Sequence, residues 1–194
     1  MLGKKTAMIT QEIFRVLLDS MSHPGRILKL PEIKVKNGKA EYDAFFAALY
    51  TLLDHEVTFS VIGTGVHEEF IDKVYQLTKS PYVGIDQADY VVVCGGSSGN
   101  MMEHVKRGEQ EFPDKGAMVF YQVDDLGGPS GSRLNLSGPG VLDRIEFTVS
   151  GADPDDLALI NPINSEFPLG IDVIFVDQAM KVASITRSSR VAVL

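Results

Sequence analysis

The most constraining feature of this sequence is the segment Tyr90–Cys94, in which three consecutive valines lie between the tyrosine and the cysteine. The run is continuously apolar instead of alternating with polar residues, which is typical of a strand buried on both faces in the middle of a sheet. Such a strand needs covering elements on both sides of the sheet. The segment therefore predicts a central strand in an α/β fold.

Strand-like and helix-like segments alternate around it. Helical periodicity predicts a first helix after an N-cap at Thr10 and further helices over residues 42–53 and 66–77. A helix with Pro154 at its opening position and a short helix over residues 100–107 are also predicted. The first helix is expected to present one apolar face, made of Ile13, Phe14, Leu17, Leu18 and Met21. Strands are predicted within residues 25–31, 56–63, 115–126, 133–140, 143–151, 170–177 and 181–186, the last two joined by a short turn.

The chain is expected to form one domain, residues 1–194, with a mixed sheet flanked by helices on both faces. It shows no internal repeat and no linker, and Asn37–Gly38 marks a turn within the domain.

Composition limits the classes of partner. Of the 194 residues, 44% are hydrophobic and 23% charged, and the formal net charge is −8. An acidic surface argues against nonspecific binding to nucleic acid or to an anionic membrane. The single cysteine, Cys94, permits no intrachain disulfide and is expected to be a small buried residue. With neither a signal peptide nor a membrane-spanning segment in the pattern, a cytoplasmic location is predicted.

The Gly95–Gly99 loop that follows the central strand raises the question of a phosphate cradle. Its sequence, GGSSG, lacks the glycine spacing of a dinucleotide fingerprint and is not followed by a Lys-Ser/Thr pair. We interpret it as a surface connection, and anion binding by its backbone N–H groups remains the alternative.

No set of residues forms a recognisable catalytic or metal centre. His23, His55, His67 and His104 are scattered and show no zinc-ligand spacing. Lys115 and Lys181 are interpreted as solvent-facing, and neither has a cofactor-anchoring context. The residues therefore predict no cofactor and no metal.

Two arginines near the carboxyl terminus are the strongest candidates for binding. Arg187 and Arg190 enclose Ser188 and Ser189, in a chain that is otherwise acidic. The planar guanidinium fork suits phosphate or carboxylate. Two interpretations stay open: these residues contact an anion, or the arginines pair with a neighbouring carboxylate or a partner chain.

Gly/Pro turns are the remaining motifs. One turn contains Ser137, Gly138, Pro139 and Gly140, and another contains Pro24 and Gly25. Such turns build a surface by default, and a ligand pocket is the second interpretation.

Six segments in order resemble the phosphonate metabolism protein family PhnH, a subunit of the bacterial carbon–phosphorus lyase core complex. They cover residues 14–25, 48–61, 113–126, 134–141, 167–177 and 185–191, and include SMSHPG, LNLSGPGV and ITRSSRV. The resemblance implies a fold like the large domain of pyridoxal-phosphate-dependent transferases, without the cofactor or its lysine.

The resemblance also implies a function. The complex transfers an alkylphosphonate to the ribose C1 of ATP and displaces adenine, an α-D-ribose 1-methylphosphonate 5-triphosphate synthase reaction. A member of the family is expected to be a homodimer that assembles with the other core subunits and is inactive alone, with a scaffolding role. The alternative is a separate α/β enzyme or ligand-binding domain that acts on a phosphorylated small molecule.

Overall fold

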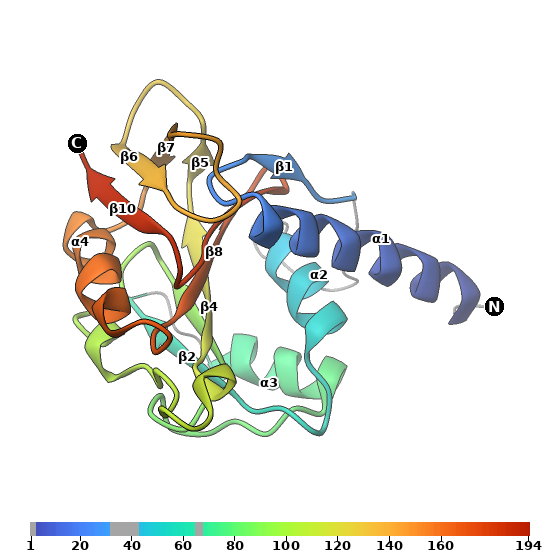
Figure 1. The fold of residues 1–194 in the computed structure, drawn as a ribbon. Helices are drawn as coiled ribbons and strands as arrows, with labels where there is room; N and C mark the ends of the chain where they lie inside the picture. Colours follow the sequence, from blue (N-terminus) through green and yellow to red (C-terminus); the bar gives the residue numbers. More distant parts are fainter. Residues whose placement is uncertain (1–2, 32–42, 65–67) are drawn as a thin grey trace.

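A six-stranded mixed sheet crosses the centre of the molecule (Figure 1). The computed structural model describes residues 3–31, 43–64 and 68–194, with side chains from residue 7 onward. The strand order is β1 (Leu28–Lys29), β9 (Lys181–Ile185), β8 (Asp172–Asp177), β4 (Met118–Val123), β3 (Tyr90–Cys94) and β2 (Phe59–Gly63). Strands β2, β3, β4 and β8 are parallel, and β9 and β1 extend the sheet in antiparallel fashion. The predicted central strand is confirmed, since β3 has a parallel neighbour on each side.

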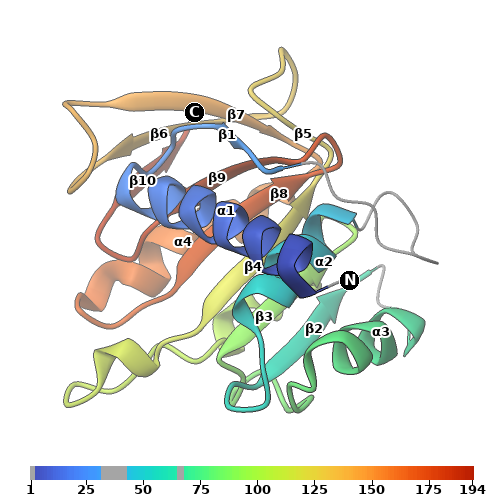
Figure 2. The same cartoon turned by 90° about the vertical axis from the view of Figure 1, so that its right-hand side faces the viewer.

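Three helices cover one face of this sheet, as Figures 1 and 2 show. They are α1 (Gly3–Ser22), α2 (Asp43–Leu52) and α3 (Glu68–Thr78). Alternate strand residues such as Val92, Phe120 and Ile174 pack against the buried side chains of these helices. Cys94 belongs to the same cluster, and burial raises the pKa of its thiol to about 12, so its expected place in the core is confirmed.

The opposite face carries helix α4 (Pro154–Ile163) and a second sheet. This sheet is antiparallel, with the order β10 (Arg190–Val193), β6 (Ser132–Ser137), β7 (Ile145–Ser150) and β5 (Asp125–Leu126). The predicted α/β class with a mixed sheet is confirmed. The covering of this face by four strands as well as a helix was not predicted, because β10 pairs with β6, which lies about fifty residues earlier in the chain.

Helix α1 begins earlier than predicted and presents a different face. It starts at Gly3, so the N-cap assignment at Thr10 is wrong: the Thr10 hydroxyl lies inside the helix and donates to the carbonyl of Ala7. Ile13 and Leu17 are buried, whereas Phe14 and Leu18 are 47% and 54% exposed. The apolar positions therefore divide between the core and an exposed stripe.

The predicted helix over residues 100–107 is also wrong. Only the short 3-10 helix η2 (Met102–His104) forms there, followed by η3 (Pro113–Lys115) before β4. The carbonyl of Lys106 accepts a hydrogen bond from the N–H of Ala117, which leads the chain toward the start of β4 instead of into a helix. A third such turn, η4 (Asn164–Glu166), follows α4.

Other predicted elements agree with the structure or lie outside it. Helix α4 begins after Asp153, whose carboxylate accepts from the N–H of Asp155, with Pro154 in the first turn as predicted. The Asn37–Gly38 turn and the starts of the helices predicted at residues 42 and 66 lie outside the described residues. Within the described ranges, no helix combines the length and apolar character needed to cross a membrane.

Candidate functional site

The turns singled out in the sequence meet at one place in the fold. Gly138 lies directly against the arginine motif, residues 186–190. Its φ is +132°, and a Cβ there would lie 3.0 Å from the carbonyl oxygen of Ser188 and 3.2 Å from the Cα of Ser189. Ser137, the preceding residue, pairs with Arg190 in the β6–β10 ladder. The β6–β7 turn and the arginine motif thus approach closely, and a side chain at Gly138 would be strained by its φ and would require its neighbours to move by a few tenths of an ångström.

The Pro24–Gly25 turn supports the β6–β7 turn from the other side. Gly25 donates its N–H to the carbonyl of Ser184 at 2.9 Å. A Cβ on Gly140 would collide with the carbonyl of Ser22 and lie 2.9 Å from the Cδ of Pro24. The end of α1, the β6–β7 turn and the chain after β9 therefore form one packed group.

Arg187 is held by a carboxylate of this chain. Its Nε and Nη2 both donate to the Oδ2 of Asp172, at 3.0 and 2.6 Å, and its backbone N–H donates to Oδ1 at 2.8 Å. Its guanidinium also donates to the carbonyls of Pro113 and Gly116. Arg187 thus connects the amino ends of β4 and β8 with the turn after β9, and its charge is balanced by Asp172.

The other residues of the motif have different surroundings. Ser189 is buried, and its hydroxyl lies 2.9 Å from the Oγ1 of Thr186, while the hydroxyl of Ser188 lies 3.1 Å from the same atom. Arg190 is exposed at the start of β10, and within the described residues it has no ion pair with a carboxylate. The two arginines, three residues apart in the sequence, therefore differ in charge pairing: Arg187 is paired with a carboxylate and Arg190, among the described residues, is not.

A cavity of about 410 Å³ opens beside this motif, between the turn after β9, the β6–β7 turn and the segment after α4. Its lining residues are Pro139, Asn161, Asn164, Ser165, Phe167, Arg187, Ser188, Ser189 and Arg190. All four candidate contact residues from the arginine motif thus lie in one wall, with Pro139 from the predicted turn. Sequence reasoning missed the asparagines and Phe167, because α4 gave no signal that it packs beside β10.

The Gly95–Gly99 loop lies at the other end of the parallel strands, and several of its donors have internal acceptors. The backbone N–H and hydroxyl of Ser98 both donate to the Asp156 carboxylate, and the hydroxyl of Ser97 donates to Asp153. Asp156 also accepts from the hydroxyl of Tyr121 at 2.6 Å. Because two carboxylates already face the loop, an added anion would meet repulsion, and the surface-connection interpretation is the better one.

Lys181 is not solvent-facing as interpreted from the sequence. Its ammonium donates to the Asp125 carboxylate and the Leu126 carbonyl, and it lies 3.3 Å from the buried Asp177 carboxylate. The Asp125 partner raises the pKa of Lys181. This ammonium joins the β8–β9 hairpin to β5 and so links the two sheets.

The described histidines do not form a metal-binding group. His23 lies 2.9 Å from the Asp19 carboxylate on the surface of α1, and His67 lies outside the described residues. Among the residues that the structure describes, no group of three or more histidine, cysteine or acidic side chains is arranged to hold a metal ion.

Comparison with known proteins identifies the family. The profile of the bacterial phosphonate metabolism protein (PhnH) matches residues 4–192, which is nearly the whole chain. This chain belongs to the PhnH family. Every segment on which the resemblance rested, including the arginine motif and the β6–β7 turn beside the cavity, lies inside the match.

A curated relative agrees with the PhnH assignment. HtxG of Stutzerimonas stutzeri, provisionally named as a C-P lyase subunit protein, is 29% identical over 182 residues. The alignment covers 93% of this chain and 85% of HtxG. The PhnH chain described here is thus similar to HtxG along nearly its whole length.

Proposed function

We propose that this PhnH-family chain is a subunit of the carbon–phosphorus lyase core complex in phosphonate catabolism, with a role in assembly. The observation that carries the proposal is the family match over residues 4–192, joined by the similarity to HtxG. In the proposed role the chain supports transfer of an alkylphosphonate to the ribose C1 of ATP with loss of adenine, while other core subunits carry the reacting groups.

The internal pairing of the acidic side chains supports this role. Asp172 is paired with Arg187, Asp177 with Lys181, and Asp156 with the hydroxyls of Ser98 and Tyr121. Groups held in this way connect strands and turns, and freeing one for acid–base chemistry would leave its buried partner without compensation.

The exposed stripe of α1 is the surface that we assign to the homodimer. Ala7, Gln11, Phe14 and Leu18 follow one another at intervals of four, three and four residues, which places them on one side of the helix. Arg15 next to them and Glu12 supply charges of both signs. A two-fold contact brings each of these residues against the same patch of a second copy, so opposite charges can meet across it.

The assembly role is tested by co-expressing the tagged chain with the other carbon–phosphorus lyase subunits of its host. We expect these subunits to co-purify with it, and we expect the chain alone to release no adenine from ATP and methylphosphonate. Release of adenine by the isolated chain would contradict the assembly role.

The homodimer is tested separately by light scattering on the double variant Phe14→Ser/Leu18→Ser, which we expect to be monomeric at concentrations where the parent chain is dimeric. Leu142→Ser is the matched control, since Leu142 is 97% exposed in the β6–β7 turn and is not part of the stripe. A double variant that stays dimeric but loses the other subunits would assign the stripe to one of them instead.

The proposed fold relationship is to the large domain of pyridoxal-phosphate-dependent transferases, without the cofactor. Its support is the mixed sheet with helices on both faces together with the engagement of Lys181 by carboxylates, which leaves that amine unsuited to a Schiff base. Addition of pyridoxal phosphate is expected to produce no visible absorption band from a Schiff base.

A stand-alone enzyme or binding domain for a phosphorylated small molecule is the second candidate function. The observation in its favour is the 410 Å³ cavity beside Arg190. Turnover of such a molecule by the isolated chain, without other subunits, would favour this candidate over the assembly role.

A further inference from the structure

The cavity beside the arginine motif differs in charge from the rest of the molecule. The whole chain has a formal charge of −8. The described residues that line the cavity include two arginines, five neutral polar side chains, a proline and a phenylalanine, and no acidic side chain is among them. An anion that approached this cavity would therefore meet positive charge, in contrast to the negative charge of the chain as a whole.

We propose that this cavity binds the oxyanion group of a small organic molecule, with Arg190 as the ion-pairing residue. The proposal goes beyond the assembly role, because a subunit that only positions other subunits needs no ligand. The group recognised is a phosphate or a carboxylate, which matches the planar donor face of a guanidinium.

Arg190 has the free charge that such a site requires. Arg187 is neutralised by Asp172 and directs four donor contacts at Asp172, Pro113 and Gly116. Arg190 lines the same cavity, is exposed, and has no carboxylate partner in the described part of the chain. Arg187 is thus a positioning residue that holds the turn 186–189, and Arg190 is the contact residue.

Neutral hydrogen-bond donors lie beside Arg190. The side-chain oxygen of Asn161 accepts from the N–H of Val191 at 3.4 Å, which directs the amide so that its NH₂ group is left for another acceptor. The hydroxyl of Ser188 lies 3.1 Å from that of Thr186, and one of the two can donate onward. A cation with amide and hydroxyl donors around it is a suitable environment for an oxyanion.

The apolar lining specifies the rest of the ligand. Phe167, which is 64% exposed, and Pro139 both line the cavity. The volume, about 410 Å³, falls in the range of small-molecule pockets and exceeds what a bare phosphate fills. The ligand class is therefore a phosphate monoester or a carboxylate that carries a ring or short apolar group.

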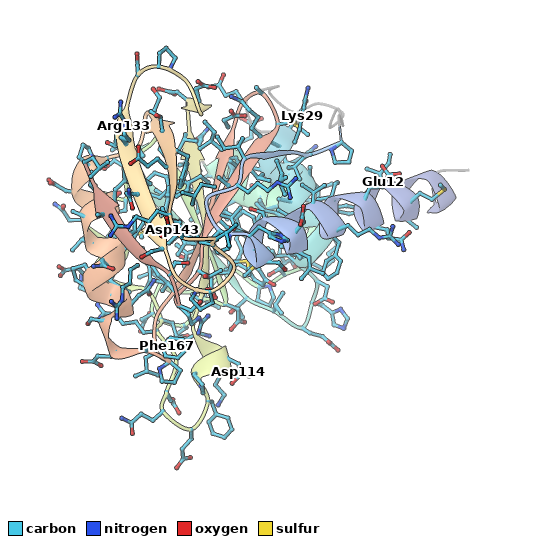
Figure 3. The ribbon with its side chains drawn as sticks, turned by 45° about the horizontal axis from the view of Figure 1, so that its top comes forward. Glu12, Lys29, Asp114, Arg133, Asp143 and Phe167 are labelled. Carbon is cyan, nitrogen blue, oxygen red and sulfur yellow. The ribbon has the colours of Figure 1, made fainter. Side chains whose placement is uncertain are left out.

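An exposed arginine outside the cavity allows a matched control. Figure 3 shows Phe167 at one end of the molecule and Arg133 toward the opposite end. Arg133 is an exposed arginine on β6 that does not line the cavity. The pair Arg190→Gln and Arg133→Gln thus removes the same charge inside and outside the proposed site.

The first experiment titrates the purified full chain with phenyl phosphate, benzoate and inorganic phosphate in a calorimeter. We expect saturable binding of phenyl phosphate or benzoate, weaker binding of inorganic phosphate, and a loss of affinity at higher salt. Arg190→Gln is expected to lower the affinity roughly tenfold or more, while Arg133→Gln leaves it unchanged. Absence of binding by the parent chain, or equal losses in both variants, would overturn the proposal.

A second variant tests the cavity without removing an arginine. Asn161→Asp keeps the oxygen that accepts from Val191 but replaces the free NH₂ with a carboxylate oxygen. We expect this variant to melt close to the parent temperature without ligand and to lose ligand binding through charge repulsion. Binding that survives in Asn161→Asp would place the ligand elsewhere. Because binding is measured on the chain alone, its failure is distinguishable from a failure of co-purification.

Discussion

Arg187 and Asp172 form an ion pair in which one carboxylate accepts three hydrogen bonds from a single arginine residue, two from its guanidinium and one from its backbone N–H. The two side chains are only 17% and 13% exposed. The pair joins the start of β8 to the turn after β9, so it determines where Ser188, Ser189 and Arg190 lie.

Replacing Asp172 by Asn is expected to lower the free energy of unfolding by about 2–3 kcal/mol, because the guanidinium would remain in a partly buried site without its counter-charge. Urea denaturation measures this change. Asp114→Asn, an exposed position, is the control and should change stability by less than about 0.5 kcal/mol. Equal stability of the two variants would show that the pair contributes little.

The ion pair between Lys106 and Asp89 predicts that the stability of the fold depends on pH. Burial raises the pKa of Asp89, but the Lys106 ammonium at 2.6 Å and the donors of Thr58 outweigh burial, so the pKa is lowered overall. A carboxyl whose pKa is lower in the folded state stabilises the fold above its unfolded pKa, about 3.9, and this stability is lost as the pH falls through the folded pKa.

Lys106→Met should therefore be less stable than the parent chain at pH 7, with a difference that shrinks as the pH falls below about 4. Chemical denaturation at several pH values measures the difference. Lys115→Met serves as the control, since the Lys115 ammonium lies 4.0 Å from the centre of the Phe112 ring and not against a carboxylate. A difference independent of pH would contradict the coupling to Asp89.

Tyr121→Phe tests the buried network at the Gly95–Gly99 loop. Burial and then the adjacent Asp156 raise the pKa of Tyr121, so its hydroxyl stays protonated and donates to Asp156. Removing it leaves the buried carboxylate with one donor fewer, and we expect a loss of about 1–3 kcal/mol in thermal or urea unfolding.

The matched control for this change is Tyr90→Phe. Tyr90 stacks on Phe120, and its hydroxyl has no partner in the described part of the chain. Its replacement should cost less than about 0.5 kcal/mol. If the two tyrosine variants were equally stable, the network would contribute little to the fold.

Gly138→Ala tests the close approach of the β6–β7 turn to the arginine motif. The φ of +132° and the 3.0 Å approach to the Ser188 carbonyl lead us to expect a loss of about 2–3 kcal/mol. Gly99→Ala has a φ of +65° with open space around it, so only the backbone penalty of about 1 kcal/mol applies. Thermal unfolding of both variants should show this order, and the reverse order would contradict the close approach.

Some elements follow from local sequence alone. The continuous run of valines in β3 predicts a strand buried on both faces, which the structure confirms. Pro154 directly after Asp153 predicts the start of α4, since proline is favoured in the first turn of a helix. Thr10 misled because a threonine hydroxyl can bond either at a helix start or back to an earlier carbonyl within the helix, and nearby residues do not distinguish the two. Strand β10 was missed because its partner lies about fifty residues away.

By itself the sequence determined the α/β class, the central strand and the family resemblance, since these depend on residue patterns along short segments. It identified Arg187 and Arg190 as a pair but left their roles open. Only the tertiary structure separated them. Strand β8 brings Asp172 to Arg187, while β10 and α4 leave Arg190 beside the cavity with no carboxylate partner among the described residues. The reason is physical, because the electrostatic state of an arginine depends on which charges surround it in space, and those come from distant parts of the chain.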